Sequence, residues 1–232
     1  MPAPGFDPLI DLLEKLLTTT PPFTALQVMQ DAPVTPVIVL NDLAHAVPLA
    51  RALVAGGIRM LEVTLRTPQA LACIEAIARE VPEAVVGAGT VRTRADVQAA
   101  AMAGARFAVS PGYTATVGQA CRDAHLPLLP GVATGGEIMM AMEDGLTELK
   151  FFPAVQAGGI AMLRAWNGPF WDVRFCPTGG ISLSNAADFL ALPNVACVGG
   201  SWLVPQEALE QGDWARITEL AREALNLRKN GA

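Results

Sequence analysis

The chain has 232 residues, of which 52% are hydrophobic and 16% are charged, and its formal net charge at pH 7 is -6. This length supports one large domain with a substantial core. An acidic chain without a dense run of Lys or Arg is a poor ligand for nucleic acid and anionic membranes, so neither is expected as a partner. No apolar run is long enough to span a bilayer, and no basic segment typical of a signal peptide opens the chain. We therefore expect a cytoplasmic protein.

Residues 1–33 precede the first predicted strand. We interpret them as a helical segment packed on the domain that follows, at the bottom of that domain. The run Thr18–Pro22 interrupts the segment with two prolines and is interpreted as a linker.

Eight short apolar segments follow, at intervals of roughly 20–30 residues, as in repeated strand–helix units. Their neighbours are Ala-rich stretches with helical spacing, and a final amphipathic helix is expected from about Asp213 to Leu227. The predicted strands are Val34–Leu40, Arg59–Leu65, Ala84–Thr90, Ala105–Pro111, Leu126–Val132, Glu148–Ala154, Val173–Gly179 and Val195–Ser201. The clearest predicted helices are Leu43–Ala55, Pro68–Arg79, Arg94–Ala103 and Ala186–Leu192.

Residues that favour the start or the end of a helix lie at the expected helix ends. Threonine and serine are favoured N-caps, and glycine is favoured just past a helix end. The expected N-caps are Thr67, Thr93, Thr134 and Ser184, and the expected helix stops are Gly56, Gly104 and Gly145.

Eight strand–helix units predict an α/β protein with a single closed (β/α)8 TIM barrel, spanning residues 34–232, with the N-terminal helical extension outside it. The strands are apolar on both faces, as buried parallel strands are. An open doubly wound sheet is the alternative fold. It would normally carry a Gly-rich turn after the first strand, and Val37–Asp42 has none.

Lys150 is the most unusual residue of the sixth strand, because it lies between Leu149 and two phenylalanines. Burial disfavours the charged form of an amine, and the uncharged form is the nucleophile. Strand periodicity groups Lys150 with inward-facing neighbours, as it does for polar residues on two other strands. These inward groups are Glu148, Lys150 and Phe152; Glu62, Thr64 and Arg66; and Arg174, Cys176 and Thr178.

Inward charges call for an explanation, because barrel interiors are usually filled by branched apolar side chains. A structural ion pair between Glu62 and Lys150 is one explanation, since such pairs occur in structural networks. It leaves Arg66 and the glycine-rich strand ends unexplained. A catalytic site accounts for all of them.

Glycines close the seventh and eighth strands, in Pro177–Gly180 and Gly199–Ser201. The loops after these strands often form a phosphate site in barrels, because glycine lets the backbone approach an anion closely and helix N-termini offer N–H groups. Ser201 adds a hydroxyl donor. The pattern predicts an anion site at these ends.

Other candidates have two interpretations each. Thr90, at the third strand end, is either a substrate contact or a helix cap. Pro111 and Pro130 at strand ends either shape a pocket or serve turns alone. His45 and His125 lie in or beside helices and are interpreted as structural.

The cysteines and the acidic residues point to neither a disulfide framework nor a metal centre. Cys73, Cys121, Cys176 and Cys197 form no Cys-x-x-Cys pair and are interpreted as small buried residues in a reducing compartment. No His, Asp or Glu cluster has metal-ligand spacing, so no metal is expected.

Several of these motifs, in unbroken order over Val34–Ala224, resemble the family of 2-keto-3-deoxy-6-phosphogluconate (KDPG) and 4-hydroxy-2-oxoglutarate (KHG) aldolases. The resemblance implies a class I, metal-independent aldolase on a (β/α)8 barrel, without a cofactor and typically a homotrimer. Gly135-Gly136 and Val155-Gln156 differ from the family pattern, and the N-terminal extension is longer. The motifs that carry the resemblance are Leu61–Thr67, Val86–Val91, Lys150–Ala154, Arg174–Gly180 and Gly199–Trp202.

The resemblance also implies a role for each site residue. Lys150 matches the Schiff-base lysine and Glu62 the general acid and base. Arg66 and Thr90 match the positions that hold the substrate carboxylate. The remaining matches are Pro111 and Phe152 in the pocket wall, Thr178 at the substrate, and Gly179, Gly180, Gly200 and Ser201 at the phosphate.

The implied function is cleavage of KDPG to pyruvate and glyceraldehyde 3-phosphate, a step of the Entner–Doudoroff pathway, with KHG as a further substrate that gives pyruvate and glyoxylate. Three alternatives stay open. In the first, the protein is an aldolase whose main substrate is unphosphorylated. In the second, it is a different lyase or isomerase in which Lys150 acts only through its charge. In the third, it is a non-catalytic barrel that binds sugar acids or serves as a trimeric scaffold. Intact Lys150, Glu62 and Arg66 weigh against the last.

Overall fold

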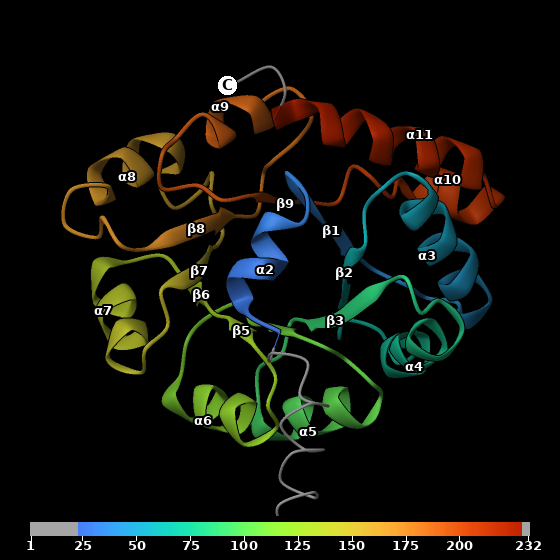
Figure 1. Cartoon of the computed structure of the whole chain (residues 1–232), viewed down its shortest axis with the longest axis horizontal. Helices are drawn as coiled ribbons and strands as arrows, with labels where there is room; N and C mark the ends of the chain where they lie inside the picture. Colours follow the sequence, from blue (N-terminus) through green and yellow to red (C-terminus); the bar gives the residue numbers. More distant parts are fainter. Residues whose placement is uncertain (1–22, 229–232) are drawn as a thin grey trace, which may run out of the picture.

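The structure is a computed structural model, and it describes residues 23–228. Parallel strands lie at the centre of the molecule and helices surround them (Figure 1). The strands are β1 (Val34–Ile38), β2 (Met60–Thr64), β3 (Val85–Gly89), β4 (Ala108–Val109), β5 (Leu128–Leu129), β6 (Gly131–Val132), β7 (Glu148–Phe151), β8 (Arg174–Pro177) and β9 (Val198–Gly200). The helices are α2 (Ala25–Gln30), α3 (Ala46–Ala55), α4 (Ala70–Glu80), α5 (Arg94–Met102), α6 (Ala115–Asp123), α7 (Gly135–Glu143), α8 (Gly159–Trp166), α9 (Ala186–Leu190), α10 (Gln206–Gln211) and α11 (Trp214–Leu225).

Each of the eight predicted strand segments contains a strand, which confirms the α/β class and the parallel arrangement. The fifth segment contains two strands, β5 and β6, because Pro130 separates them and a proline cannot donate a ladder hydrogen bond. Six strands form a curled sheet in the order β5-β4-β3-β2-β1-β9, and β6-β7-β8 form a second sheet. Two isolated bridges complete the contacts on this side: Phe175 of β8 pairs with Val195, just before β9, and Thr178, just after β8, pairs with Gly199 of β9.

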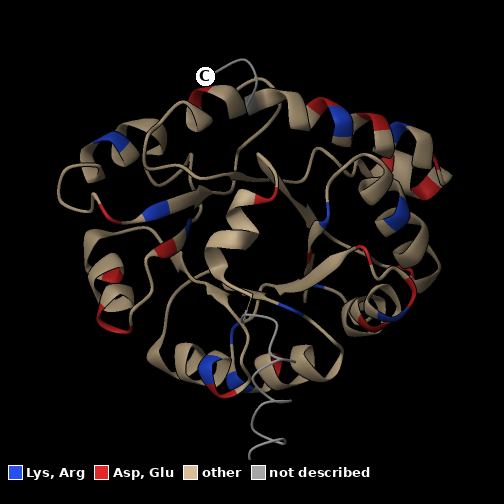
Figure 2. Ribbon diagram, in the orientation of Figure 1, with Lys and Arg blue, Asp and Glu red and all other residues tan. Residues whose placement is uncertain are grey.

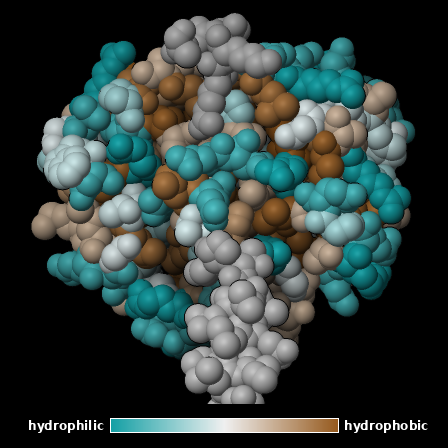
Figure 3. All heavy atoms as spheres, in the orientation of Figure 1, coloured by the Kyte–Doolittle hydropathy of each residue, from teal (hydrophilic) through white to brown (hydrophobic). Residues whose placement is uncertain are grey.

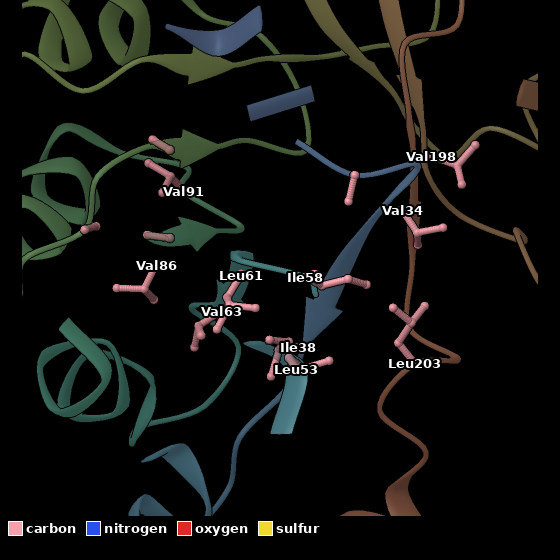
Figure 4. Close-up of a cluster of buried hydrophobic side chains, with 14 of the residues drawn as sticks. Val34, Ile38, Leu53, Ile58, Leu61, Val63, Val86, Val91, Val198 and Leu203 are labelled. Atoms are coloured by element: carbon pink, nitrogen blue, oxygen red, sulfur yellow. The ribbon is translucent and has the colours of Figure 1, made fainter. Parts of the chain in front are cut away.

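The core has two parts, one on each side of the strands. Leu61 and Val63 of β2 pack outward against the helices with Ile38 and Leu53 (Figure 4). Met60, from the alternate face of β2, packs inward. The predicted period-two division is therefore confirmed within β2, whereas Arg66, which the same pattern places inward, lies in a turn after the strand and is exposed. The inner cluster comprises Val28, Met29, Met60, Phe107, Val109, Leu129, Cys176 and Cys197.

Helix α2 covers one end of this inner cluster and lies in front of the strands in Figure 1. Thr24 caps the helix and forms a reciprocal capping box with Gln27. Val28 and Met29 are its buried residues. The predicted segment of residues 1–33 thus contains one short helix against the strands, while residues 1–22, with the predicted linker at Thr18–Pro22, lie outside the described residues.

Charged residues belong mostly to the outer helices and loops (Figure 2). On the face that carries α2, hydrophilic residues cover most of the rim, and hydrophobic residues lie between the rim and the centre (Figure 3). Charges on the inner face of the strands are therefore exceptional. Within residues 23–228, no helix has the length and hydropathy needed to cross a membrane.

Two of the four predicted N-caps are confirmed. Thr93 and Thr134 each cap a helix and form a capping box, with Asp96 and Glu137. Gly104 and Gly145 follow helices with positive φ angles, as predicted. The final helix α11 starts after its N-cap Asp213 and ends at Leu225, close to its predicted bounds.

The predictions for Thr67 and Ser184 are wrong. Gln69 precedes α4 and makes no side-chain cap, while the Thr67 hydroxyl donates to the carbonyl oxygen of Leu40. The residue before α9 is Asn185, and the Ser184 hydroxyl pairs with that of Ser182. In both places the hydroxyl that was predicted to cap a helix forms a hydrogen bond with another group instead.

Replacing Met29 with alanine is expected to destabilise the protein by about 2–4 kcal/mol, because it removes a fully buried side chain from the inner cluster. Met102→Ala is the matched control. Met102 is 84% exposed, so its loss should change the free energy of unfolding by less than about 0.5 kcal/mol. Chemical denaturation of both variants measures the difference. Equal stabilities would show that α2 does not contribute to the core.

Candidate active site

A buried ion pair joins the two sheets inside the molecule. Lys150 on β7 donates from Nζ to Oε1 of Glu62 on β2, at 3.1 Å. The two side chains are only 5% and 4% exposed. Within residues 23–228, no second carboxylate lies within 4.0 Å of the Lys150 amine. Both side chains therefore occupy the inward positions that strand periodicity predicts.

Glycines on β3 provide the space for this pair. A Cβ on Gly89 would lie 2.3 Å from Oε1 of Glu62, which is too close for any real contact. A Cβ on Gly87 would lie 2.5 Å from the Phe107 ring. In β2–β3 pairing, Glu62 and Gly87 are register partners. The inner face of β3 thus carries no side chain at Gly87 and Gly89, which leaves room there for the side chains of Phe107 and Glu62.

Aromatic and sulfur groups form the immediate surroundings of the lysine. The Phe152 ring centroid lies 5.3 Å from Nζ, within the range of a cation–π contact. Cys176 on β8 is the register partner of Lys150. A hydrogen bond with Cys197, aided by the positive charge of Lys150, lowers the pKa of the Cys176 thiol from its usual value, against the opposing effect of burial. Cys176 and Cys197 are both buried, as predicted, and none of the four cysteines forms a disulfide.

Arg66 follows β2 in a turn, where its side chain is exposed. Its Nε donates to Oγ1 of Thr90 at 3.2 Å. Thr90 has a φ of +60°, a rare conformation for a β-branched residue that costs of order 1–3 kcal/mol. The helix-cap interpretation of Thr90 is wrong, because α5 is capped by Thr93. The strained backbone of Thr90 instead holds a hydroxyl against the guanidinium.

A pocket of about 150 Å³ opens beside Arg66, at the carboxyl ends of β1, β8 and β9. Lys150 and Glu62 do not line it, but the ring of Phe152 is shared between the pocket wall and the lysine. Thr90 does not line the pocket itself, but its hydroxyl contacts Arg66, which does. The lining residues are Val37, Val39, Arg66, Phe152, Thr178, Gly179, Gly180, Ile181, Gly199, Gly200 and Ser201.

The glycines predicted for an anion site line this pocket, and their backbone requires glycine. Gly179 and Gly180 have φ angles of +98° and +74°, where side chains are strained. A Cβ on Gly200 would lie 1.8 Å from the Trp202 ring. Helices α9 and α10 start several residues further on, so the loop backbone itself faces the pocket.

Pro111 is one of the predicted site residues that lie outside this pocket. A Cβ on Gly131 would lie 2.3 Å from the carbonyl carbon and oxygen of Pro111, so the two residues are in close contact. Gly131 is in turn the register partner of Lys150. Pro111 thus borders the strand next to the lysine rather than the pocket wall.

Val37, Val39 and Ile181 are lining residues that the sequence did not single out. The three apolar residues resemble ordinary core positions in the sequence. Gly199 belongs to the glycine-rich strand end that the sequence predicts, and it lines the pocket. A Cβ there would lie 2.2 Å from Oγ1 of Thr178, so Gly199 fixes where that hydroxyl points.

The part of the chain that the structure describes contains no group of three or more His, Cys, Asp or Glu residues able to hold a metal ion. The polar atoms at the site are instead one amine, one carboxylate, one guanidinium and several hydroxyl and amide groups. A buried amine beside a carboxylate, at the carboxyl ends of parallel strands, is typical of an α/β enzyme that forms covalent intermediates.

Comparison with known proteins agrees with this class. The family model described as KDPG and KHG aldolase matches residues 26–220. The 2-dehydro-3-deoxy-phosphogluconate aldolase of Dickeya dadantii and the KHG/KDPG aldolase of Escherichia coli are each 56% identical over 202 residues, which cover 87% of this chain and 95% of theirs. The chain belongs to the KDPG and KHG aldolase family.

A solved structure of a relative is also similar. KDPG aldolase from Legionella pneumophila, with pyruvate captured as a covalent carbinolamine intermediate, has a TM-score of 0.86 and 49% sequence identity. The match covers 88% of this chain and 98% of the Legionella chain.

Gly89→Ala is expected to lower kcat by about 10²-fold or more, because the new methyl group displaces the Glu62 carboxylate from Lys150. Gly136→Ala is the matched control, since a Cβ at Gly136 would meet nothing within 4 Å. Steady-state kinetics of both variants, with circular dichroism to check folding, measure the effect. A folded Gly89→Ala variant with wild-type kcat would contradict this account of the pair.

Proposed function

We propose that the protein is a class I aldolase that cleaves KDPG to pyruvate and glyceraldehyde 3-phosphate. The observation that carries the proposal is the buried Lys150–Glu62 pair beside a pocket with one cation and a glycine-rich wall. Membership of the aldolase family supports it. A buried amine next to a carboxylate supplies both a nucleophile and a proton carrier, which are the two groups that Schiff-base chemistry needs.

The chemistry begins when Glu62 takes a proton from the Lys150 ammonium, and the uncharged amine then attacks the C2 carbonyl carbon of the substrate. Glu62 gives that proton to the C2 hydroxyl of the resulting carbinolamine, which loses water and becomes a protonated imine. This cation accepts the electron pair of the C3–C4 bond as the bond breaks, while the C4 hydroxyl proton passes to Glu62, directly or through water. Glyceraldehyde 3-phosphate leaves, and the enamine of pyruvate stays on the lysine.

Glu62 then returns the proton to C3 of the enamine, which restores the imine, and water releases pyruvate and the free amine. Because Nζ and Oε1 are 3.1 Å apart, one carboxylate serves every proton transfer next to the lysine. The Legionella relative with its pyruvate carbinolamine supports this sequence of covalent steps.

Arg66 and Thr90 hold the carboxylate of the keto acid in this proposal. The guanidinium is a planar fork that matches a carboxylate, and Thr90 already fixes its Nε. At the other end of the pocket, Gly179, Gly180, Gly200 and Ser201 receive the phosphate through backbone N–H groups and one hydroxyl. Thr178 and Phe152 lie between these ends, and Pro111 supports the strand beside the lysine.

We also propose a closed (β/α)8 barrel, in which β5 and β6 form one strand interrupted at Pro130 and the bridges from β8 close the ring. Metal independence is proposed from the donor set, since the amine and carboxylate suffice for the chemistry. A homotrimer is proposed from the family resemblance, and sedimentation equilibrium tests it.

Borohydride reduction in the presence of pyruvate tests the proposed function. Wild-type protein should gain one reduced pyruvyl group on Lys150, located by peptide mapping, and Lys150→Met should gain none. KDPG cleavage should persist in EDTA. The non-catalytic alternative and the alternative in which Lys150 acts only through its charge both require that no adduct forms, so an unmodified Lys150 would overturn the proposal.

KHG is a second candidate substrate, which the family description supports. Ser201→Ala separates the two substrates, because KHG has no phosphate to lose a hydrogen bond. The KM for KDPG should rise about 10–150-fold, the value of one hydrogen bond to a charged group, while kcat/KM for KHG stays within about twofold. Equal effects on both substrates would place the phosphate elsewhere.

A further inference from the structure

Thr67 breaks a local rule of the sequence. It stands at a position typical of a helix N-cap, yet its hydroxyl donates at 2.5 Å to the carbonyl oxygen of Leu40, on the neighbouring chain segment. The helix that follows, α4, begins after Gln69 without a side-chain cap. Departures from local preference concentrate at functional sites, so the use of this hydroxyl calls for an explanation.

Thr64 makes a parallel contact one step earlier. Its Oγ1 donates to the carbonyl oxygen of Ile38 at 2.9 Å, and the residue is fully buried. The backbone register between β1 and β2 ends at the pair Ile38 and Val63. At and beyond that point, the hydroxyls of Thr64 and Thr67 donate to carbonyl oxygens of the other segment, those of Ile38 and Leu40.

Arg66 lies between these two attachments. Its own N–H donates to the carbonyl oxygen of Thr64 at 2.8 Å, within a turn. On the other strand, Val37 and Val39 flank Ile38 and line the same pocket as Arg66. The Thr64 and Thr67 bonds therefore connect the apolar wall of the pocket to the turn that carries its cation.

We propose that Thr67 is a positioning residue for Arg66, and that its hydrogen bond to Leu40 sets the affinity of the site for the keto acid carboxylate. This rests on the proposed function, in which Arg66 binds that group. Without the bond, the turn loses its attachment to Leu40 and keeps those before Arg66, from the Thr64 hydroxyl and from the Leu65 N–H to the carbonyl oxygen of Gly89. The guanidinium then samples positions away from Thr90, and the substrate must meet the entropic cost of fixing it.

The test compares Thr67→Val, which keeps the shape and removes the hydroxyl, with Thr67→Ser, which restores the hydroxyl. Thr218→Val is the matched control. The Thr218 hydroxyl also donates to a backbone carbonyl oxygen, that of Ala52 at 2.9 Å, but it lies between α11 and α3 in the outer layer. The measurements are the pyruvate concentration for half-maximal borohydride trapping, KM and kcat for KDPG, and the melting temperature.

Thr67→Val should raise the half-saturating pyruvate concentration and the KM for KDPG by about fivefold, the effect of one hydrogen bond, with kcat within about twofold. Thr67→Ser should return both values to within about twofold of wild type. Thr218→Val should lower the melting temperature and leave both values unchanged. If Thr67→Val does not fold, Thr67→Ala makes the same comparison.

Two results would overturn the proposal. A Thr67→Val variant with wild-type pyruvate dependence and a lower melting temperature would assign the bond to stability alone, and the proposed aldolase function would survive. Absence of a pyruvate adduct in the wild-type protein would instead overturn the proposed function, and this inference with it.

Discussion

The contact between Lys150 and Glu62 is the constraint on which the rest of the site depends. Two charged groups that are almost completely buried are stable only together, and removal of one partner from such a pair typically costs 3–5 kcal/mol. The surrounding residues are arranged to admit the pair. Gly89 leaves room for the carboxylate, and Phe152 covers the amine. The interior thus gives up tight apolar packing at this level in return for reactive groups held away from water.

Side chains and backbone contribute to different parts of the pocket. At its Arg66 end, hydroxyl groups fix the geometry, through Thr90 and the two threonines that attach β2 to β1. At its other end, glycines bring the main chain close, because their conformations and contacts exclude side chains. A molecule with a carboxylate at one end and a phosphate at the other matches this polarity.

Much of this arrangement is predictable from the sequence, because the side chains of a strand alternate between its two faces with a period of two residues. Lys150 and Glu62 stand out as charges in apolar segments, and alternation places both on the inner face. Gly179 and Gly180 stand out by their position after a strand. In these cases a single local pattern and the tertiary structure agree.

Other features escape such prediction for identifiable reasons. Pro130 divides a strand inside an apolar run that looks continuous. The hydroxyl of Thr67 has two possible partners, and only the folded chain brings the carbonyl oxygen of Leu40 within reach. Val37 and Val39 line the pocket, but their apolar side chains carry no mark that separates them from the core.

Lys150 and Glu62 belong to different sheets and are 88 residues apart in the chain. Neither the six-stranded sheet nor the three-stranded one contains a complete reactive centre. Bringing such distant segments together is among the slower events in forming a protein, since the intervening chain must close first. Enzymatic turnover therefore requires the completely folded chain, and a partly folded chain that has formed only one of the two sheets is expected to be inactive.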